Sequence, residues 1–204
     1  YDAQDRVTKV TDQRGLVTSY TYDAYDKVLT IDSPDTGLRI NTYDEAGNLL
    51  TTTYPGGLVK QYSYDALNRL IGINFPSDTS RNISYVYDQP SSTYGVGRLT
   101  EVQDSGGITR FNYDHRGNVV ERVSIRGANS YSSTYVYDLA DRRIRAVYPS
   151  GRVVNYLRDI EGRVASIDTQ LDNLSSSVPI VSQIDYEPFG PRASMGFGNQ
   201  LALS

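Results

Sequence analysis

Four stretches of the sequence align without gaps: YDAQDRVTKV (residues 1–10), YDAYDKVLTI (22–31), YDEAGNLLTT (43–52) and YDALNRLIGI (64–73). Their aspartates, Asp2, Asp23, Asp44 and Asp65, are 21 residues apart. The pattern recurs with spacings of 23, 26, 24 and 21 residues at Asp88, Asp114, Asp138 and Asp159. Self-similarity at such a period is typical of repeat architectures. The chain is therefore predicted to contain eight tandem copies of one small structural unit.

Aromatic residues precede the repeat aspartate, which we number position 0. Position −1 is Tyr in seven of the eight units and Arg158 in the remaining one; the tyrosines are Tyr1, Tyr22, Tyr43, Tyr64, Tyr87, Tyr113 and Tyr137. Position −3 is Asn41 in one unit and otherwise aromatic: Tyr20, Tyr62, Tyr85, Phe111, Tyr135 and Tyr156. Residues two apart project from the same face of a strand. We expect a continuous stripe on one face, with cross-strand tyrosine ladders in which each aromatic pair adds roughly 0.2–1 kcal/mol.

The residues after the aspartate predict a hairpin turn. In the seven units without the insertion at 89–97, position +3 holds only Gly, Asn or Asp, the residues that best tolerate the left-handed conformation: Asp5, Asp26, Gly47, Asn68, Gly117, Asp141 and Gly162. A type I turn followed by one left-handed residue closes a hairpin, and a leading Asp can cap it. Position +4 is basic or an amide, and position +5 is aliphatic except at Arg143. We expect positive φ at every +3 position.

A second kind of turn lies about midway between successive repeat aspartates. SPDTG (33–37), YPGG (54–57), DSGG (104–107) and YPSG (148–151) contain the Pro and Gly pairs that mark turns. Two turns per repeat predict a continuous antiparallel meander of about sixteen strands. The fold class is therefore all-β: tandem β-hairpin repeats forming an antiparallel, twisted or spiralling single-layer sheet.

Composition agrees with a sheet that has no conventional core. Tyr occurs 18 times in the 204 residues, Trp and Cys are absent, and hydrophobic residues make up 38%, below the roughly 45–50% of globular domains. A net charge of −4 with scattered Lys and Arg argues against nucleic acid as a partner. Without cysteine there is no thiol ligand or nucleophile. No apolar run reaches the roughly 18 residues of a membrane span.

The unit Y-x-Y-D-x-x-G/N/D-R/N-L/V closely resembles the YD repeat of bacterial Rhs proteins, of the shell subunits of insecticidal toxin complexes, and of teneurins. The resemblance covers residues 1–167 as eight YD repeats. Residues 168–183 are expected to be an irregular, Ser-rich excursion. The resemblance resumes over 184–204, which is similar to the start of a further, truncated repeat. We expect the chain to be a piece of something longer, because the closing element of the Rhs core is absent.

The resemblance implies a function: a structural segment of a shell that encapsulates or presents a C-terminal toxin or effector domain. It also implies a secreted or cell-surface location in a bacterium, and the remainder of the same longer chain as the partner. The alternative is an extracellular module whose exposed tyrosines bind carbohydrate or a cell surface. An enzyme is not expected, since the repeat distributes its carboxylates evenly instead of clustering an acid, a base or a nucleophile.

Candidate chemical sites have simpler structural interpretations. His115 is the only histidine, so a triad or zinc site lacks parts, and we expect an exposed turn residue. The repeat aspartates could ligate Ca²⁺, but hairpin tips about 10 Å apart do not converge on one ion. We predict neither cofactor nor metal. The insertion QPSSTYGVG (89–97) is expected at a hairpin tip, as a contact surface or a tolerated excursion.

Overall fold

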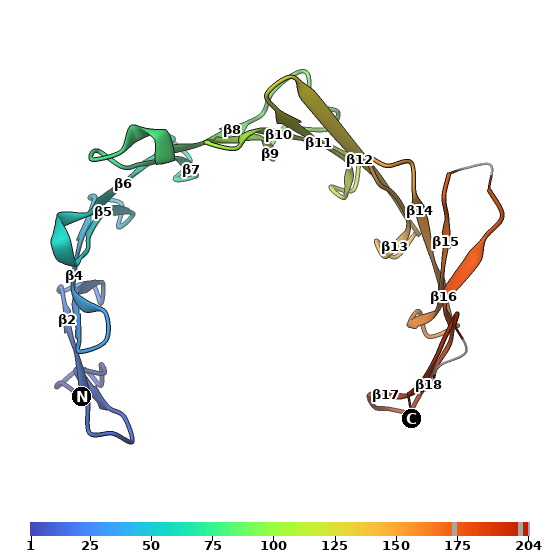
Figure 1. The fold of residues 1–204 in the computed structure, drawn as a ribbon. Coiled ribbons are helices and arrows are strands. Elements are labelled where there is room, and N and C mark those ends of the chain that lie inside the picture. Colours follow the sequence, from blue (N-terminus) through green and yellow to red (C-terminus); the bar gives the residue numbers. More distant parts are fainter. Residues whose placement is uncertain (173–174, 200–201, 204) are drawn as a thin grey trace. The chain divides into compact units, whose positions relative to one another are not determined.

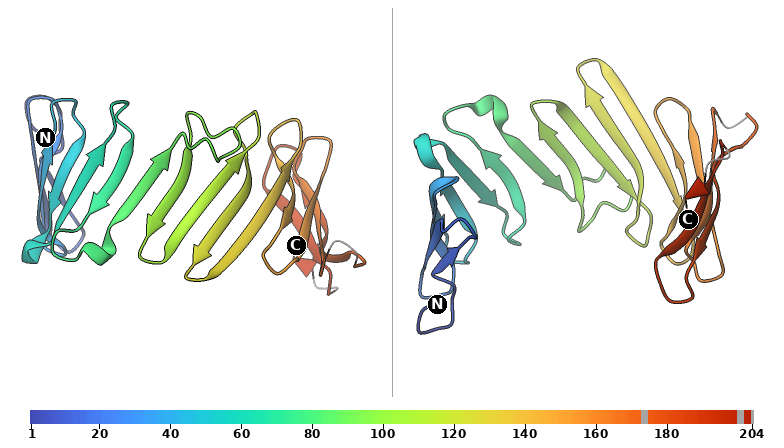
Figure 2. Two further views of the ribbon diagram at one scale, coloured as in Figure 1. Left: turned by 90° about the horizontal axis from the view of Figure 1, so that it is seen from above. Right: turned by 60° about the horizontal axis from the view of Figure 1, so that its bottom comes forward.

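The computed structural model describes residues 1–172, 175–199 and 202–203, and the chain divides into two compact units. The first comprises Tyr1–Val86 and Val102–Gly106, and the second comprises Tyr87–Glu101 and Gly107–Ser204. Each unit is a meander of antiparallel strands in a single layer (Figures 1 and 2). The all-β antiparallel fold class is confirmed.

In the first unit each strand pairs with the next along the chain, from the first to the eighth. Short 3-10 turns at Pro55–Gly57 and Thr79–Arg81 interrupt the connections. The strands are β1 (Lys9–Thr11), β2 (Val17–Tyr22), β3 (Val28–Ser33), β4 (Gly37–Tyr43), β5 (Leu49–Thr53), β6 (Val59–Tyr64), β7 (Leu70–Asn74) and β8 (Ile83–Tyr87). The last residue of β8, Tyr87, belongs to the second unit, and strand β9 (Leu99–Asp104) also has residues in both units.

In the second unit the same neighbour-to-neighbour pairing runs from β10 to β18. Its strands are β10 (Gly107–Tyr113), β11 (Val119–Arg126), β12 (Asn129–Tyr137), β13 (Arg143–Val147), β14 (Val153–Arg158), β15 (Val164–Gln170), β16 (Val178–Tyr186), β17 (Arg192–Phe197) and β18 (Ala202–Leu203). The described residues therefore form eighteen strands, against about sixteen expected. The difference arises because the chain continues to pair after Gln170.

The stretch expected to be irregular is mostly paired strand. Residues up to Gln170 extend β15, and β16 begins at Val178, with Ile167 opposite Val181. Serines tolerate extended backbone, so a Ser-rich composition does not distinguish a loop from an exposed strand. The division of the chain at 167/168 and 183/184 remains a prediction.

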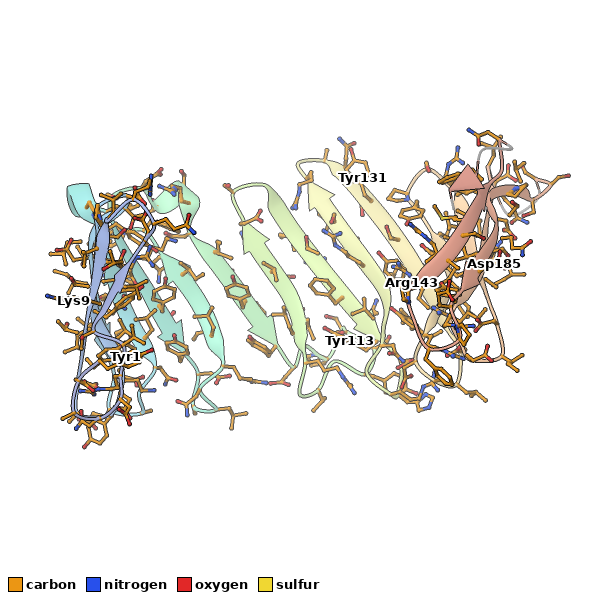
Figure 3. All side chains as sticks on the ribbon, turned by 90° about the horizontal axis from the view of Figure 1, so that it is seen from below. Tyr1, Lys9, Tyr113, Tyr131, Arg143 and Asp185 are labelled. Carbon is orange, nitrogen blue, oxygen red and sulfur yellow. The ribbon has the colours of Figure 1, made fainter. Side chains whose placement is uncertain are left out.

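The hairpin register shifts by one residue beside the repeat tyrosine. The shifts fall between Thr21 and Tyr22, between Thr42 and Tyr43, and between Ser63 and Tyr64. This irregularity is what a type I turn followed by a left-handed residue produces in a three-residue hairpin loop. The turns of the repeat aspartates therefore line one edge of each unit's sheet, and the second turns line the other. Tyr113 and Tyr131, near opposite ends of their strands, mark these two edges in the second unit (Figure 3).

Burial is sparse, as a single layer requires. Among the described residues the buried apolar side chains are Phe75, Ala146, Val153, Val154 and Val181. Half-buried residues dominate the strands. With so little apolar area removed from water, hydrogen bonds and ion pairs between neighbouring repeats contribute a larger share of the stability than they do in a two-layer domain.

Candidate functional site: the joints between repeats

In seven of the eight repeats the turn at the repeat aspartate is closed by its own residues, and at Asp88 the turn spans the insertion to Arg98. The main-chain N–H of Asp2 donates to the carbonyl of Arg6, and the Asp2 Oδ1 accepts from the N–H groups of Gln4 and Arg6 at 2.9 and 3.0 Å. Equivalent Oδ1 caps occur at Asp23, Asp44, Asp65, Asp114, Asp138 and Asp159. All seven +3 residues have positive φ, between 58° and 98°. The predicted turn, including its aspartate cap, is confirmed.

The tyrosine at position −1 joins one repeat to the one before it. Its hydroxyl donates to the main-chain carbonyl at position +5 of the preceding repeat, next to the turn. In the first unit the pairs are Tyr22–Val7, Tyr43–Val28 and Tyr64–Leu49, at 2.8, 2.9 and 3.0 Å. In the second unit they are Tyr113–Leu99, Tyr137–Val119 and Tyr186–Val164. We call each such contact between consecutive hairpin tips a joint, and number it by the earlier repeat.

The side chain at position +4 forms the other half of a joint. In the first joint the Arg6 guanidinium pairs with Asp2 Oδ2 at 2.7 Å, donates to the Asp23 carbonyl and Asp26 Oδ1 at 2.8 and 2.9 Å, and lies 4.9 Å from the Tyr22 ring centroid. An Arg placed in this way links two tips through planar N–H donors. Cation–π contact adds to the link.

An amide performs the same task at two joints. Asn48 Nδ2 donates to Asp44 Oδ2 at 3.0 Å and to Asn68 Oδ1 at 2.8 Å. Asn118 Nδ2 donates to Asp114 Oδ2 at 3.0 Å and to Asp141 Oδ1 at 2.6 Å. The +4 residue of one repeat therefore contacts the +3 residue of the next. This contact explains why the motif restricts both positions.

Where position +3 is glycine, the cation of the preceding repeat lies against it. A Cβ at Gly162 would coincide with the Arg142 guanidinium, and a Cβ at Gly117 would lie 2.9 Å from Arg98 Nη2. Two features therefore favour glycine at these positions: the positive φ and the space required by the neighbouring arginine.

Arg158, which replaces the tyrosine of position −1, preserves the joint by other means. Its Nη2 donates to the carbonyl of Arg143 at 2.9 Å, and Arg143 is the +5 residue of the preceding repeat. Its Nη1 donates to the carbonyl of Gly162 at 2.9 Å, while its buried Nε has no hydrogen-bond partner. The Arg143 guanidinium lies 5.5 and 5.3 Å from the Tyr135 and Tyr156 ring centroids. Arg158 therefore reaches the same +5 carbonyl that the tyrosine hydroxyl reaches at the other joints.

The −3 aromatics lie on one face within each unit, as expected. The register places Tyr20 opposite Ile31, Tyr62 opposite Ile73, and Ile73 opposite Ile83 on the same face as Tyr85. In the second unit Phe111 is opposite Arg122, and Arg122 is opposite Ser133, which shares its face with Tyr135. Tyr135 in turn is opposite Ala146, and Ala146 is opposite Val154, which shares its face with Tyr156.

The expected ring-to-ring ladder is wrong. Among the described residues one aromatic pair is in contact, Tyr94 and His115, at 6.4 Å between ring centroids. Members of a column are two strands apart, roughly 10 Å, and an aliphatic or polar residue stands between them. The tyrosines of position −1 act through their hydroxyls and through cations beside their rings.

A ninth turn of the same kind, at residues 187–191, was not predicted from the sequence. The N–H of Glu187 donates to the carbonyl of Pro191, and the N–H of Gly190 donates to that of Glu187, as in the aspartate turns. Tyr186 completes the joint, with Arg163 at 4.5 Å from its ring centroid. The signal was present in Tyr-Glu-Pro-Phe-Gly, but Glu in place of Asp obscured it. Part of the predicted truncated repeat, residues 200–201 and 204, lies outside the described residues.

The insertion at residues 89–97 docks on the following hairpin. Ser92 Oγ donates to the Phe111 carbonyl at 2.6 Å, and the N–H of Thr93 donates to Asn112 Oδ1 at 2.9 Å. Gly95 is buried, and a Cβ there would lie 2.7 Å from the Thr100 side chain. The insertion is therefore an ordered loop that hydrogen-bonds to strand β10. His115 is exposed in its turn, as expected.

The turn hydrogen bonds also perturb titration. The Asn118 amide that donates to Asp114, together with main-chain N–H groups, lowers the pKa of that carboxyl to about 2. Burial raises the pKa of Tyr64 and of Tyr137, whose hydroxyls are engaged in joints. Within the part of the chain that the structure describes, no three His, Cys, Asp or Glu side chains gather as metal ligands, and no helix is long and apolar enough to cross a membrane.

Comparisons with known proteins agree with this geometry. Residues 1–38 and 43–80 match the family described as RHS Repeat. No curated protein matches the sequence significantly. The crystal structure of TcdB2-TccC3 superimposes with a TM-score of 0.78 at 14% identity, covering 99% of this chain and 13% of that one. The Photorhabdus luminescens Tc holotoxin pore, carrying a TccC3-D651A mutation, superimposes with a TM-score of 0.79 at 15% identity, over 95% of this chain and 11% of that one.

A single-layer meander held by tyrosine and arginine joints defines a class of protein, the tandem β-hairpin repeat sheet. Two stretches of the chain, residues 1–38 and 43–80, match the RHS Repeat family, and the chain shares its fold with the solved TcdB2-TccC3 and Tc holotoxin structures. It spans little more than a tenth of the length of the solved chains that it matches.

Proposed function

We propose that this chain is a wall segment of a larger protein shell that encapsulates or presents a C-terminal toxin or effector domain outside the producing cell. In this role the chain performs no reaction. Its repeats hold a continuous sheet together, and the remainder of the longer protein supplies the further wall and the cargo.

One observation carries the proposal: the same joint recurs from repeat to repeat. The Tyr22, Tyr64 and Tyr137 hydroxyls make the same bond to the preceding repeat. A chemical site would concentrate unusual groups at one place, whereas these groups are spread evenly along the edge. Such an arrangement is suited to a wall whose stability is a sum of neighbour contacts.

The likeness to TcdB2-TccC3 and to the Tc holotoxin supports the same role. The match covers almost the whole of this chain and a small share of theirs, as expected for one stretch of a long sheet. At 14–15% identity the likeness is one of fold, and the shell function and the location outside the cell are part of the proposal.

The test uses the full-length protein that contains this segment. Limited proteolysis should leave the region after the repeats intact in the wild type. The triple variant Tyr22→Phe, Tyr43→Phe and Tyr64→Phe, which loosens three joints without changing shape, should expose that region. Tyr25→Phe, at an 83% exposed tyrosine, is the matched control. Equal cleavage of wild type and triple variant would contradict the wall function.

A glycan array with the 204-residue chain addresses the carbohydrate-binding alternative. A wall segment should give no saturable binding at its tyrosine face. Saturable binding that is lost on replacing the exposed Tyr131 would favour the binding module instead.

A further inference from the structure

The second joint differs from those of six other repeats at its +4 side chain. In six repeats the Oδ2 of the repeat aspartate accepts a hydrogen bond from the +4 side chain of the same turn, at 2.7–3.0 Å: Asp2–Arg6, Asp44–Asn48, Asp65–Arg69, Asp114–Asn118, Asp138–Arg142 and Asp159–Arg163. In the second repeat the +4 residue is Lys27. Among the described residues Asp23 Oδ2 accepts no hydrogen bond, and the Lys27 ammonium forms no ion pair.

The geometry of lysine explains the difference. A guanidinium offers its Nε to its own aspartate and its Nη groups to the next tip, whereas lysine has a single nitrogen at the end of its stem. Lys27 extends over the next turn instead: a Cβ at Gly47 would lie 3.1 Å from Lys27 Cε and 3.2 Å from its Nζ. Its nitrogen is therefore directed toward Gly47 and leaves Asp23 Oδ2 free.

A cleft lies between these two tips, with a volume of about 680 Å³. Its walls come from the turn and strand around Asp23 and from residues 41–47. The lining includes three acidic residues, Asp23, Asp44 and Glu45, and one basic residue, Lys27. The lining therefore has a net negative charge, which favours a cationic ligand. The neighbouring hairpin tips can be followed along one edge of the sheet in Figure 2.

The first joint shows which cation fits. There the Arg6 guanidinium contacts three groups: the Oδ2 of its own aspartate, the carbonyl of the next repeat aspartate, and the ring of the next tyrosine. The equivalent residues of the second joint, Asp23, Asp44 and Tyr43, all line the cleft. The second repeat thus has the same three groups, a carboxylate oxygen, a main-chain carbonyl and a tyrosine ring, but has lysine in place of arginine at position +4.

We propose that this cleft binds a guanidinium group, in the form of an arginine side chain presented by a peptide segment. The guanidinium pairs with Asp23 Oδ2 and lies over the Tyr43 ring, as Arg6 does over Tyr22. The apolar stem of the ligand packs on Leu29 and on Tyr25, which is 83% exposed. The Asp44 carbonyl, which already accepts from the Gly47 N–H, has a second lone pair available. The proposal does not depend on the wall function.

The probes are a blocked Gly-Arg-Gly tripeptide, agmatine and a blocked Gly-Lys-Gly tripeptide, titrated into the labelled 204-residue chain and followed by NMR. Saturable shifts of the Gly47 and Tyr25 amides are expected with the arginine peptide. Agmatine separates the guanidinium group from the peptide, and a weaker but saturable response is expected. The lysine peptide should bind about tenfold more weakly, because it lacks the planar pair of donors.

Variants decide whether the cleft is the site. Lys27→Arg supplies the missing guanidinium from within the chain and should reduce binding at least about tenfold. Lys9→Arg adds the same group on the exposed strand β1 and should leave binding unchanged. Asp23→Asn keeps an oxygen for the turn cap while removing the charge, and should also weaken binding. Absence of saturable shifts in the wild type, or undiminished binding in Lys27→Arg, would overturn the proposal.

Discussion

The hydroxyl of Tyr22 donates a 2.8 Å hydrogen bond to the main-chain carbonyl of Val7, which lies one residue past the turn of the preceding repeat. This bond satisfies a carbonyl at the end of the turn, where the hairpin register shifts. It also gives tyrosine an advantage over phenylalanine at position −1, since the ring alone would leave the carbonyl without this donor.

Replacing Tyr64 by Phe should lower the free energy of unfolding by about 0.5–1.5 kcal/mol, the net value of one such hydrogen bond. Urea denaturation followed by circular dichroism measures it. Tyr25→Phe, at an 83% exposed tyrosine, is the control and should be neutral. A Tyr64→Phe variant as stable as the control would mean that the hydroxyl bonds contribute nothing to the joints.

Replacing Gly47 by Val should cost about 1 kcal/mol or more, because Gly47 has φ +83° and a β-branched residue fits that region poorly. Gly47→Asn should cost much less, since Asn68 adopts φ 59° at the same position of the next repeat. Thermal melting of both variants distinguishes backbone strain from crowding by Lys27. Equal losses for Val and Asn would point to crowding.

Replacing Arg158 by Tyr should stabilise the chain by about 1 kcal/mol. The substitution restores the hydroxyl bond to the Arg143 carbonyl and removes a buried Nε that has no partner. The bond from Arg158 to the Gly162 carbonyl is lost in exchange. An unfolding midpoint below that of the wild type would show that this second bond is worth more than the unsatisfied nitrogen costs.

The stability of the chain should fall as pH decreases from about 4 to about 2. The Asn118 amide lowers the pKa of Asp114 from 3.8 to about 2, so the folded state holds this carboxylate ionised where the unfolded chain takes up a proton. The resulting stabilisation is complete above the unfolded pKa and is lost as pH falls through the folded value. Asp114→Asn keeps an acceptor for the cap and should show a shallower pH dependence of the urea midpoint. Identical slopes for the variant and the wild type would contradict this assignment.

The sequence alone sufficed for most features that are decided within a few residues, although the local turn at Glu187 was missed. The turn at Asp44 could be predicted from Asp44 and Gly47, because an aspartate cap and a left-handed residue are properties of four consecutive positions. The alternation of Tyr20 and Tyr22 determined which side chains share a face. The fold class followed from repeating these local choices at a nearly constant period.

The tertiary structure decided what each side chain meets on the neighbouring repeat. Three contacts join residues 15 to 20 positions apart: the bond from Tyr22 to Val7, the position of Arg142 against Gly162, and the bond from Arg158 to the Arg143 carbonyl. Their geometry depends on how two hairpins stack, which no single repeat encodes. For the same reason the aromatic ladder was wrong and the free Oδ2 of Asp23 was invisible in the sequence. Lys27 and Arg6 occupy the same motif position, and the structure shows that the Arg6 guanidinium pairs with Asp2 whereas the Lys27 ammonium lies against Gly47.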